Sequence, residues 1–153
     1  MAPRSCLLLV EDDFALGETL GDALDDMGFD VVVVCNGAQA IAELDAHAAE
    51  FEEVITDVDL GTGPNGWDVG RRARECVADM PVVYMSGDSG GEWSLKGVAD
   101  SVFISKPFAL AKMVEAHDTA CSGRKDARLA KPSEAEVSES CRRSGPGQHG
   151  VKR

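Results

Sequence analysis

The chain has 153 residues, of which 44% are hydrophobic and 5% aromatic, enough for one domain with a mainly aliphatic core. The formal net charge is −12, and residues 1–121 carry 23 acidic but only 7 basic side chains. Nucleic-acid binding rests on Lys and Arg neutralising phosphates, so this acidic body argues against a nucleic-acid partner. No apolar run approaches the roughly 20 residues of a membrane span, and the first residues lack the layout of a signal peptide. We therefore expect a cytoplasmic protein without a membrane partner.

Short apolar runs alternate along the chain with segments of helical periodicity. Runs that are apolar throughout are typical of strands buried on both faces of a parallel sheet, whereas apolar residues at spacings of three and four predict helices. In chain order, the predicted elements are a strand at 7–10, a helix at 14–27, a strand at 31–34, a helix from 36 or 37 to about 48, a strand at 51–56, a helix from about 67 to 76, a strand at 82–85, one or two helical turns within 92–97, a strand at 101–104 and a helix from 109 to about 121. This order predicts an α/β fold with a parallel sheet and helices on both faces.

Residues 122–153 differ from the rest of the chain in composition. They carry 8 basic and 4 acidic side chains, and their large apolar residues are limited to Leu129, Val137 and Val151. Such a segment cannot bury enough apolar surface to offset the entropy lost on ordering. We therefore predict a folded domain over residues 1–121 and a polar, disordered tail over 122–153.

Polar side chains follow four of the predicted strands at the point where each strand ends. The acidic triplet 11–13 follows the first strand, Asp57 the third, Ser86 the fourth and Lys106 the fifth. The carboxyl ends of parallel strands share one edge of the sheet, where ligands bind. The sequence therefore predicts a site at this edge that contains carboxylates, a hydroxyl and an ammonium group.

This set of groups suits a metal ion and a phosphoryl group. Clustered carboxylates repel one another, and Mg²⁺, which prefers oxygen ligands and commonly binds carboxylates together with a phosphate, relieves that repulsion. A carboxylate such as Asp57 can be a nucleophile and form an aspartyl-phosphate. Lys106 and Ser86 supply a cation and a hydroxyl donor for phosphoryl oxygens. Phosphoryl transfer needs mainly positioning and charge stabilisation, and this set provides both.

Five short motifs lie along the chain in order. They are Leu8-Leu9-Val10-Glu11-Asp12-Asp13, Ile55-Thr56-Asp57-Val58-Asp59-Leu60, Pro64-Asn65-Gly66, Tyr84-Met85-Ser86-Gly87 and Ile104-Ser105-Lys106-Pro107-Phe108. In this order and at these spacings they resemble the receiver domain of two-component response regulators, over about residues 5–121. The resemblance implies a flavodoxin-like (βα)5 doubly wound sheet with strand order 2-1-3-4-5.

The resemblance also implies a function in signal transduction. A histidine kinase or a histidine phosphotransfer protein would donate a phosphoryl group to Asp57, as in a phosphorelay, and the phosphorylated protein would present a changed surface to a partner. A receiver of this kind catalyses its own phosphorylation and slow dephosphorylation but is not an enzyme acting on other substrates.

A magnesium site follows from the same resemblance. Glu11 and Asp12 match the acidic pair of the family, with Asp12 as the direct ligand, beside Asp57 and the backbone carbonyl at Asp59. Asp13 is a close rival, because register within an acidic triplet is ambiguous. An acid at this point also suits the N-terminus of the following helix, so Asp13 can be the cap while the other two serve the metal.

The remaining implied roles concern the phosphoryl group and the switch. Lys106 would hold the phosphoryl group and precede a cis peptide bond to Pro107. Ser86 would move toward a phosphoryl oxygen, and Phe103 occupies the position of the aromatic residue that turns inward. The implied readout face consists of the fourth helix, fifth strand and fifth helix.

Three features depart from the family pattern. The fourth helix is short and flanked by glycines, Phe103 replaces the more common tyrosine, and no output domain follows residue 121. These departures predict a remodelled partner surface and a stand-alone receiver, or one cut from a larger protein. Simple core packing is an equal alternative for Phe103.

Two other functions compete with the receiver hypothesis. The segment 54–60 resembles the first motif of haloacid-dehalogenase phosphatases, although in that family the other acidic residues come after this motif rather than before it. A binding module with a receiver fold but no phosphorylation is the second alternative, suggested by the short fourth helix and the tail.

The cysteines and histidines carry no predicted chemistry. The five cysteines are odd in number and widely spaced, so we expect reduced thiols that pack as small hydrophobes. His47, His117 and His149 show no metal-ligand spacing and are interpreted as structural or solvated.

Overall fold

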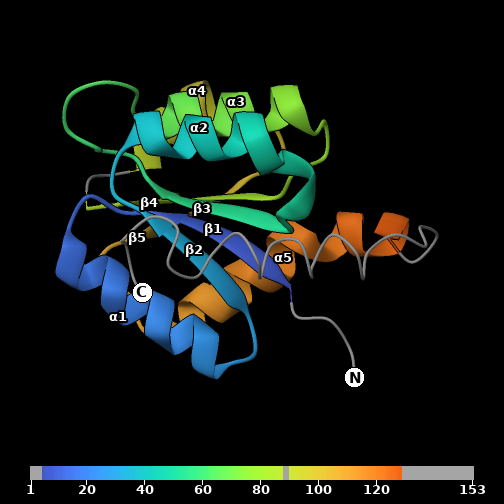
Figure 1. Ribbon diagram of the computed structural model, residues 1–153, viewed down its shortest axis with the longest axis horizontal. Coiled ribbons are helices and arrows are strands. Elements are labelled where there is room, and N and C mark those ends of the chain that lie inside the picture. The colour runs from blue at the N-terminus through green and yellow to red at the C-terminus, as the bar shows by residue number, and fades with distance from the viewer. Residues whose placement is uncertain (1–4, 88–89, 129–153) are drawn as a thin grey trace.

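The computed structural model describes residues 5–87 and 90–128, and it contains a five-stranded parallel sheet in the order β2-β1-β3-β4-β5. The elements in chain order are β1 (Cys6–Val10), α1 (Phe14–Asp26), β2 (Asp30–Val34), α2 (Gly37–His47), η1 (Ala48–Glu50), β3 (Glu53–Asp57), α3 (Gly66–Cys76), β4 (Val82–Ser86), η2 (Gly90–Glu92), α4 (Trp93–Lys96), β5 (Val102–Ser105) and α5 (Leu110–Arg128). Helices α2, α3 and α4 cover one face of the sheet, and α1 and α5 cover the other (Figure 1). The predicted flavodoxin-like fold and its strand order are confirmed.

Two hydrophobic cores lie on the two faces of the sheet because successive strand residues point to opposite sides. Leu8, Val54 and Tyr84 belong to the core beneath α2 and α3. Leu7 and Ile55, their neighbours along the strands, belong to the core beneath α1 and α5. All five are fully buried, which explains why the strands read as continuous apolar runs.

Polar side chains define where three of the helices begin. Asp13 caps α1 through Leu16 N, Asn36 caps α2 through Gln39 N, and Asn65 forms a reciprocal capping box at the start of α3. Gly28 lies just past α1 with φ of 105°, a conformation that favours glycine. These caps place each helix directly after a strand end or a tight turn.

The bounds of β3 and α5 differ from those predicted, whereas the short fourth helix agrees with its prediction. β3 begins at Glu53 rather than at residue 51, because the 3₁₀ turn η1 precedes it and ends at Glu50. α4 is a single turn of four residues, as the glycine-flanked segment indicated. α5 continues to Arg128, so the predicted domain boundary at 121 falls inside this helix. Most of the predicted tail lies outside the described residues, and its disorder stays a prediction.

Cys35, Cys76 and Cys121 are reduced, as expected. Cys6 is disulfide-bonded, so the expectation of a reduced thiol is wrong for this residue. Among the described residues, no helix combines the length and the apolar character needed to cross a bilayer.

Candidate functional site

Four polar residues meet at the carboxyl edge of the sheet. Asp57 and Ser86 are the last residues of the adjacent strands β3 and β4, and Glu11 and Lys106 directly follow β1 and β5. The backbone N–H of Lys106 donates to the carbonyl of Ser86 at 2.8 Å, which fixes the end of β5 beside β4. The Lys106–Pro107 peptide bond is cis, as predicted.

Lys106 joins two buried carboxylates. Its Nζ donates to Glu11 Oε1 at 2.8 Å and to Asp57 Oδ2 at 3.1 Å. Glu11 is 1% exposed and Asp57 is 5% exposed, so both carboxylates are largely removed from water. Two buried negative charges therefore share one ammonium group, and these three groups together carry one uncompensated negative charge when all are ionised.

Burial and the excess of negative charge at the site shift the pKa values of Asp57 and Lys106. Burial, and then the negative charge of Glu11, raise the pKa of Asp57 to about 7, in spite of the opposing effect of Lys106. Burial alone would lower the pKa of Lys106, but hydrogen bonds and charges from Glu11 and Asp57 outweigh burial and raise it. Lys106 therefore stays charged, and an additional cation near Asp57 would favour the ionised carboxylate.

A group of carboxylate oxygens that could hold a metal ion lies at the same place. One carboxylate oxygen from each of Glu11, Asp12 and Asp57 lies within 4.8 Å of the others, and Asp12 is exposed to solvent. Hard oxygen ligands with one side open to water are the donor set that suits Mg²⁺. The residues present therefore fit this ion.

Asp13 occupies a different role from its two acidic neighbours. Its Oδ1 accepts a hydrogen bond from Leu16 N at 3.1 Å, and its own N–H donates to Glu11 Oε2 at 3.1 Å. The carboxylate of Asp13 is thus used at the start of α1, where an acid also favours the helix dipole. Asp59 is exposed two residues after Asp57, and the role of its backbone carbonyl stays a prediction.

The loop after β3 is held tightly against the end of the strand. Thr56 Oγ1 donates to the carbonyl of Asp57 at 2.9 Å, and Gly66 N donates to the carbonyl of Val58 at 2.8 Å. A Cβ atom at Gly66 would collide with the carbonyl oxygen of Asp57. Glycine at this position therefore allows the first turn of α3 to pack against the backbone that carries Asp57.

Phe103, the predicted switch residue, is half-buried in β5 and stacks against a residue of α4. Its ring and that of Trp93 have centroids 6.0 Å apart and an interplanar angle of 27°. Trp93 Nε1 also donates to Ser101 Oγ at 2.9 Å, which ties the indole to the start of β5. The short fourth helix therefore covers Phe103 with an aromatic side chain, a contact that sequence reasoning missed because α4 lacks a periodic pattern.

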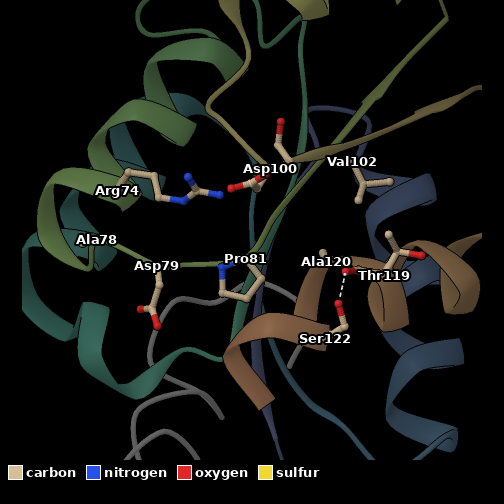
Figure 2. A pocket seen from close by; sticks show the side chains of 10 residues that line it. Arg74, Ala78, Asp79, Pro81, Asp100, Val102, Thr119, Ala120 and Ser122 are labelled. Carbon is tan, nitrogen blue, oxygen red and sulfur yellow. Dashed lines mark hydrogen bonds between the residues drawn. The ribbon is translucent and has the colours of Figure 1, made fainter. Parts of the chain in front are cut away.

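A separate pocket of about 530 Å³ lies at the opposite edge of the sheet, near the amino ends of β4 and β5 (Figure 2). Its lining includes Arg74, Asp79, Asp100 and Ser122, and the side chain of Arg74 points toward Asp100 in Figure 2. None of the predicted site residues lines this pocket. It is therefore distinct from the acidic site.

Comparison with known proteins gives a match over most of the folded chain. The family model for the response regulator receiver domain matches residues 7–118. The probable transcriptional regulatory protein SilR of Salmonella typhimurium is 36% identical over 111 residues, which cover 71% of this chain and 47% of that protein. The transcriptional regulatory protein CusR of Escherichia coli K12 is 32% identical with the same coverage. The chain thus spans about half the length of these curated relatives.

A solved structure extends the match to three dimensions. The crystal structure of a response regulator receiver protein from Sinorhizobium medicae WSM419 superposes with a TM-score of 0.75 at 38% sequence identity. The match covers 79% of this chain and 97% of that one. The similarity therefore includes nearly the whole of a protein of receiver size.

Proposed function

This chain belongs to the response regulator receiver domains of two-component signalling, and from that membership we propose that it accepts a phosphoryl group on Asp57. The donor is a histidine kinase or a histidine phosphotransfer protein, in keeping with the partners of receiver domains. Phosphorylation then changes a surface that a downstream protein recognises.

The observation that carries this proposal is the arrangement around Lys106. Its Nζ contacts both Asp57 and Glu11, so an ammonium group stands beside the proposed nucleophile at the open edge of the sheet. Carboxylate oxygens of Asp12 and Glu11, placed where they could hold a metal ion, lie next to the same carboxylate. Nucleophile, cation and metal-binding oxygens are thus together before any phosphoryl group arrives, which reduces the reorganisation that transfer requires.

The proposed transfer breaks one bond and forms another. A carboxylate oxygen of Asp57 attacks phosphorus, the bond from phosphorus to the donor's histidine nitrogen breaks, and the electron pair returns to the imidazole. Lys106 keeps its contact at the site and stabilises charge on the phosphoryl oxygens, and the hydroxyl of Ser86 donates to one of them. Glu11, Asp12, Asp57 and the carbonyl of Asp59 would hold Mg²⁺, which supplies the positive charge that keeps Asp57 ionised and neutralises the phosphoryl group.

The proposed signal passes from Ser86 to Phe103. Ser86 moves toward the phosphoryl group and vacates space at the end of β4, and Phe103 on the neighbouring strand turns inward. The face formed by α4, β5 and α5 is then read by the partner. In this chain that face includes the exposed Leu95 and the Trp93–Phe103 stack, so its partner contacts a surface reshaped by the one-turn α4.

The decisive experiment is the mass of the intact protein after incubation with acetyl phosphate and Mg²⁺. Wild type is expected to gain one acid-stable, base-labile phosphoryl group that requires Mg²⁺, and Asp57→Asn is expected to gain none. Asp45→Asn, which changes an exposed carboxylate on α2, is the matched control and should be phosphorylated as wild type is. A phosphoryl group that persists in Asp57→Asn would refute the assignment of Asp57.

The two alternative functions make different predictions in the same experiment. A haloacid-dehalogenase-like phosphatase would release many equivalents of phosphate from a generic monoester per protein, whereas a receiver carries a single group. A non-phosphorylated binding module would show no adduct and would bind its partner equally well after Asp57→Ala and without Mg²⁺. No observation in the structure favours either alternative over the receiver reaction.

A further inference from the structure

A second cluster of reactive side chains lies far from the acidic site, at the amino end of β3. Glu53, the first residue of this strand, is fully buried, and its Oε1 lies 2.5 Å from His117 Nδ1. Cys121 Sγ lies 3.6 Å from the same nitrogen. His117 and Cys121 are one turn apart on α5 and therefore share a face of that helix. The cluster unites a carboxylate, an imidazole and a thiol from two elements.

The sulfur and nitrogen atoms of the cluster have the spacing of two ligands in a tetrahedral metal site, and the oxygen and nitrogen atoms lie closer together than that. All three lie within 4.8 Å of one another. With Zn–S of about 2.3 Å and Zn–N of about 2.05 Å, tetrahedral angles place sulfur and nitrogen about 3.6 Å apart, and the observed Sγ–Nδ1 distance is 3.6 Å. The Glu53–His117 pair would have to open by about 0.8 Å to reach the tetrahedral oxygen–nitrogen separation of about 3.3 Å.

An independent observation at Glu53 also points to a cation as the ligand of this cluster. Its second oxygen, Oε2, is buried and has no hydrogen-bond partner in the structure's described part. A buried carboxylate oxygen without a partner is costly, and buried charges are normally paired or bound to metals. Burial raises the pKa of Glu53, in spite of the hydrogen bond and charge of His117. One neutral or partly charged imidazole therefore does not satisfy this carboxylate.

The imidazole is also held in a fixed orientation. Phe29 packs edge-on against His117, with ring centroids 4.9 Å apart and an interplanar angle of 73°. This contact and the hydrogen bond to Glu53 aim Nδ1 at the other two ligand atoms. A ligand that is already oriented loses little conformational freedom when a metal binds.

We propose that Glu53, His117 and Cys121 form a Zn²⁺-binding site at the amino end of β3. The mixed oxygen, nitrogen and sulfur set favours Zn²⁺ over Mg²⁺, which binds oxygen ligands almost exclusively. Three protein ligands leave a fourth position for water or another donor. Glu53 and Asp57 are four residues apart along β3, roughly 13 Å, so this site is separate from the magnesium ligands.

Binding requires an exchange of protons for the metal. Zn²⁺ takes the place of the proton between Glu53 and His117 and of the thiol proton of Cys121, and both protons pass to the buffer. Affinity for Zn²⁺ therefore falls as pH is lowered. No oxidant or reductant takes part, because Zn²⁺ has no redox chemistry at this site.

The test uses Co²⁺ as a coloured substitute for Zn²⁺ in the full-length, reduced, metal-stripped protein. Wild type is expected to develop a thiolate-to-cobalt charge-transfer absorption that saturates at one equivalent and disappears when one equivalent of Zn²⁺ is added. Cys121→Ser should lose the band, and His117→Gln and Glu53→Gln should weaken Zn²⁺ binding by about 100-fold or more. Zn²⁺ should also raise the melting temperature of wild type but not of Cys121→Ser.

Matched variants separate this cluster from other ligands in the chain. Cys76→Ser and His47→Gln remove a cysteine and a histidine elsewhere, and His47 also pairs with a glutamate, Glu50, at 3.2 Å. The double variant Cys141→Ser/His149→Gln removes the one cysteine and the one histidine of residues 129–153. Each of these proteins, and Asp57→Asn, should bind Co²⁺ as wild type does. Circular dichroism and phosphorylation by acetyl phosphate report whether each variant with an intact Asp57 is folded.

The proposal is overturned by any of three results. Wild type could show no thiolate-to-cobalt band, the band could survive in folded Cys121→Ser, or it could disappear in Cys141→Ser/His149→Gln. If Cys121→Ser does not fold, His117→Gln decides, because it leaves the thiol in place, and undiminished Zn²⁺ affinity in that variant refutes the site.

Discussion

The two ends of β3 each carry a buried carboxylate, but these carboxylates differ in their partners. Asp57, at the carboxyl end, shares an ammonium group with a second acid, next to the exposed carboxylate of Asp12. Glu53, at the amino end, faces an imidazole and a thiol under the cover of α5. A permanently charged partner and open solvent suit transfer of a phosphoryl dianion, whereas titratable soft ligands suit a transition metal. The chemistry of a strand-end carboxylate is thus set by the elements that approach it.

The largest expected effect comes from removing the cation at the carboxyl end. Lys106→Met should slow phosphorylation by acetyl phosphate about 100- to 1000-fold, because charge on the phosphoryl oxygens loses its fixed partner. Initial rates from intact-protein mass spectrometry measure this change. Lys112→Met is the matched control, since Lys112 is exposed and contacts only Glu115 among the described residues. Equal phosphorylation rates in Lys106→Met and Lys112→Met would contradict the proposed role of Lys106 at the carboxyl end of β3.

Substitutions at the amino end of β3 should instead change mainly the free energy of unfolding. His117→Leu leaves the buried carboxylate of Glu53 without its partner and should lower the free energy of unfolding by about 2–4 kcal/mol in metal-free buffer. The double variant Glu53→Met/His117→Leu should recover most of that loss, because it removes the unpaired charge as well. Urea unfolding measures both, and the partly exposed His47, replaced by Leu, should cost less than about 1 kcal/mol. A double variant as unstable as His117→Leu would contradict this account.

In the absence of metal, the contribution of Asp57 at the carboxyl end of β3 to protein stability should depend on pH. The folded-state pKa of Asp57 is raised to about 7 from its ordinary value of 3.8. The stabilisation from its proton is therefore complete below pH 3.8 and is lost as pH rises through 7. Without Mg²⁺, Asp57→Asn should exceed wild type in stability at pH 8 by about 1–2 kcal/mol, after allowance for solvent screening.

Thermal unfolding of both proteins between pH 4 and pH 8 checks this expectation. The difference should shrink toward pH 4 and should also shrink at pH 8 when Mg²⁺ is added to wild type. A gap that is the same at both pH values would show that Asp57 does not titrate near neutrality.

The smallest expected effect separates two neighbouring acids within the carboxyl end. Asp13→Ala should cost about 1 kcal/mol of stability through loss of the α1 cap, with the Mg²⁺ dependence of phosphorylation unchanged. Asp12→Ala should show the reverse, a higher Mg²⁺ requirement with little loss of stability. Thermal melts and Mg²⁺ titrations of phosphorylation measure the two properties, and equal Mg²⁺ requirements in both variants would contradict the division of roles.

The residues at the carboxyl end of β3 could be predicted from the sequence because the pattern that marks them is local. A polar residue directly after an apolar strand is visible in the sequence, and parallel topology brings such residues to one edge. Within the acidic triplet, the sequence allowed Asp13 as either a helix cap or a rival metal ligand, and the hydrogen bond that its side chain accepts from Leu16 N identifies it as the cap of α1.

The cluster at the amino end of β3 was not predicted from the sequence, for a physical reason. Glu53 resembles a loop residue before a strand, and its partner His117 is 64 positions away. Histidine and cysteine at a spacing of four on an amphipathic helix also resemble ordinary packing. The third ligand was placed beside them only by the packing of α5 against β3, which the linear pattern does not contain.

The stack of Trp93 on Phe103 gives this chain an optical signal of its own. The other tryptophan, Trp67, is buried against Tyr84, with ring centroids 4.7 Å apart, and Trp67→Phe would leave a single indole fluorophore. An inward turn of Phe103 would uncover one face of that indole to water and shift its emission to longer wavelengths. The state of Asp57 would then be readable in a cuvette, in real time and without a label.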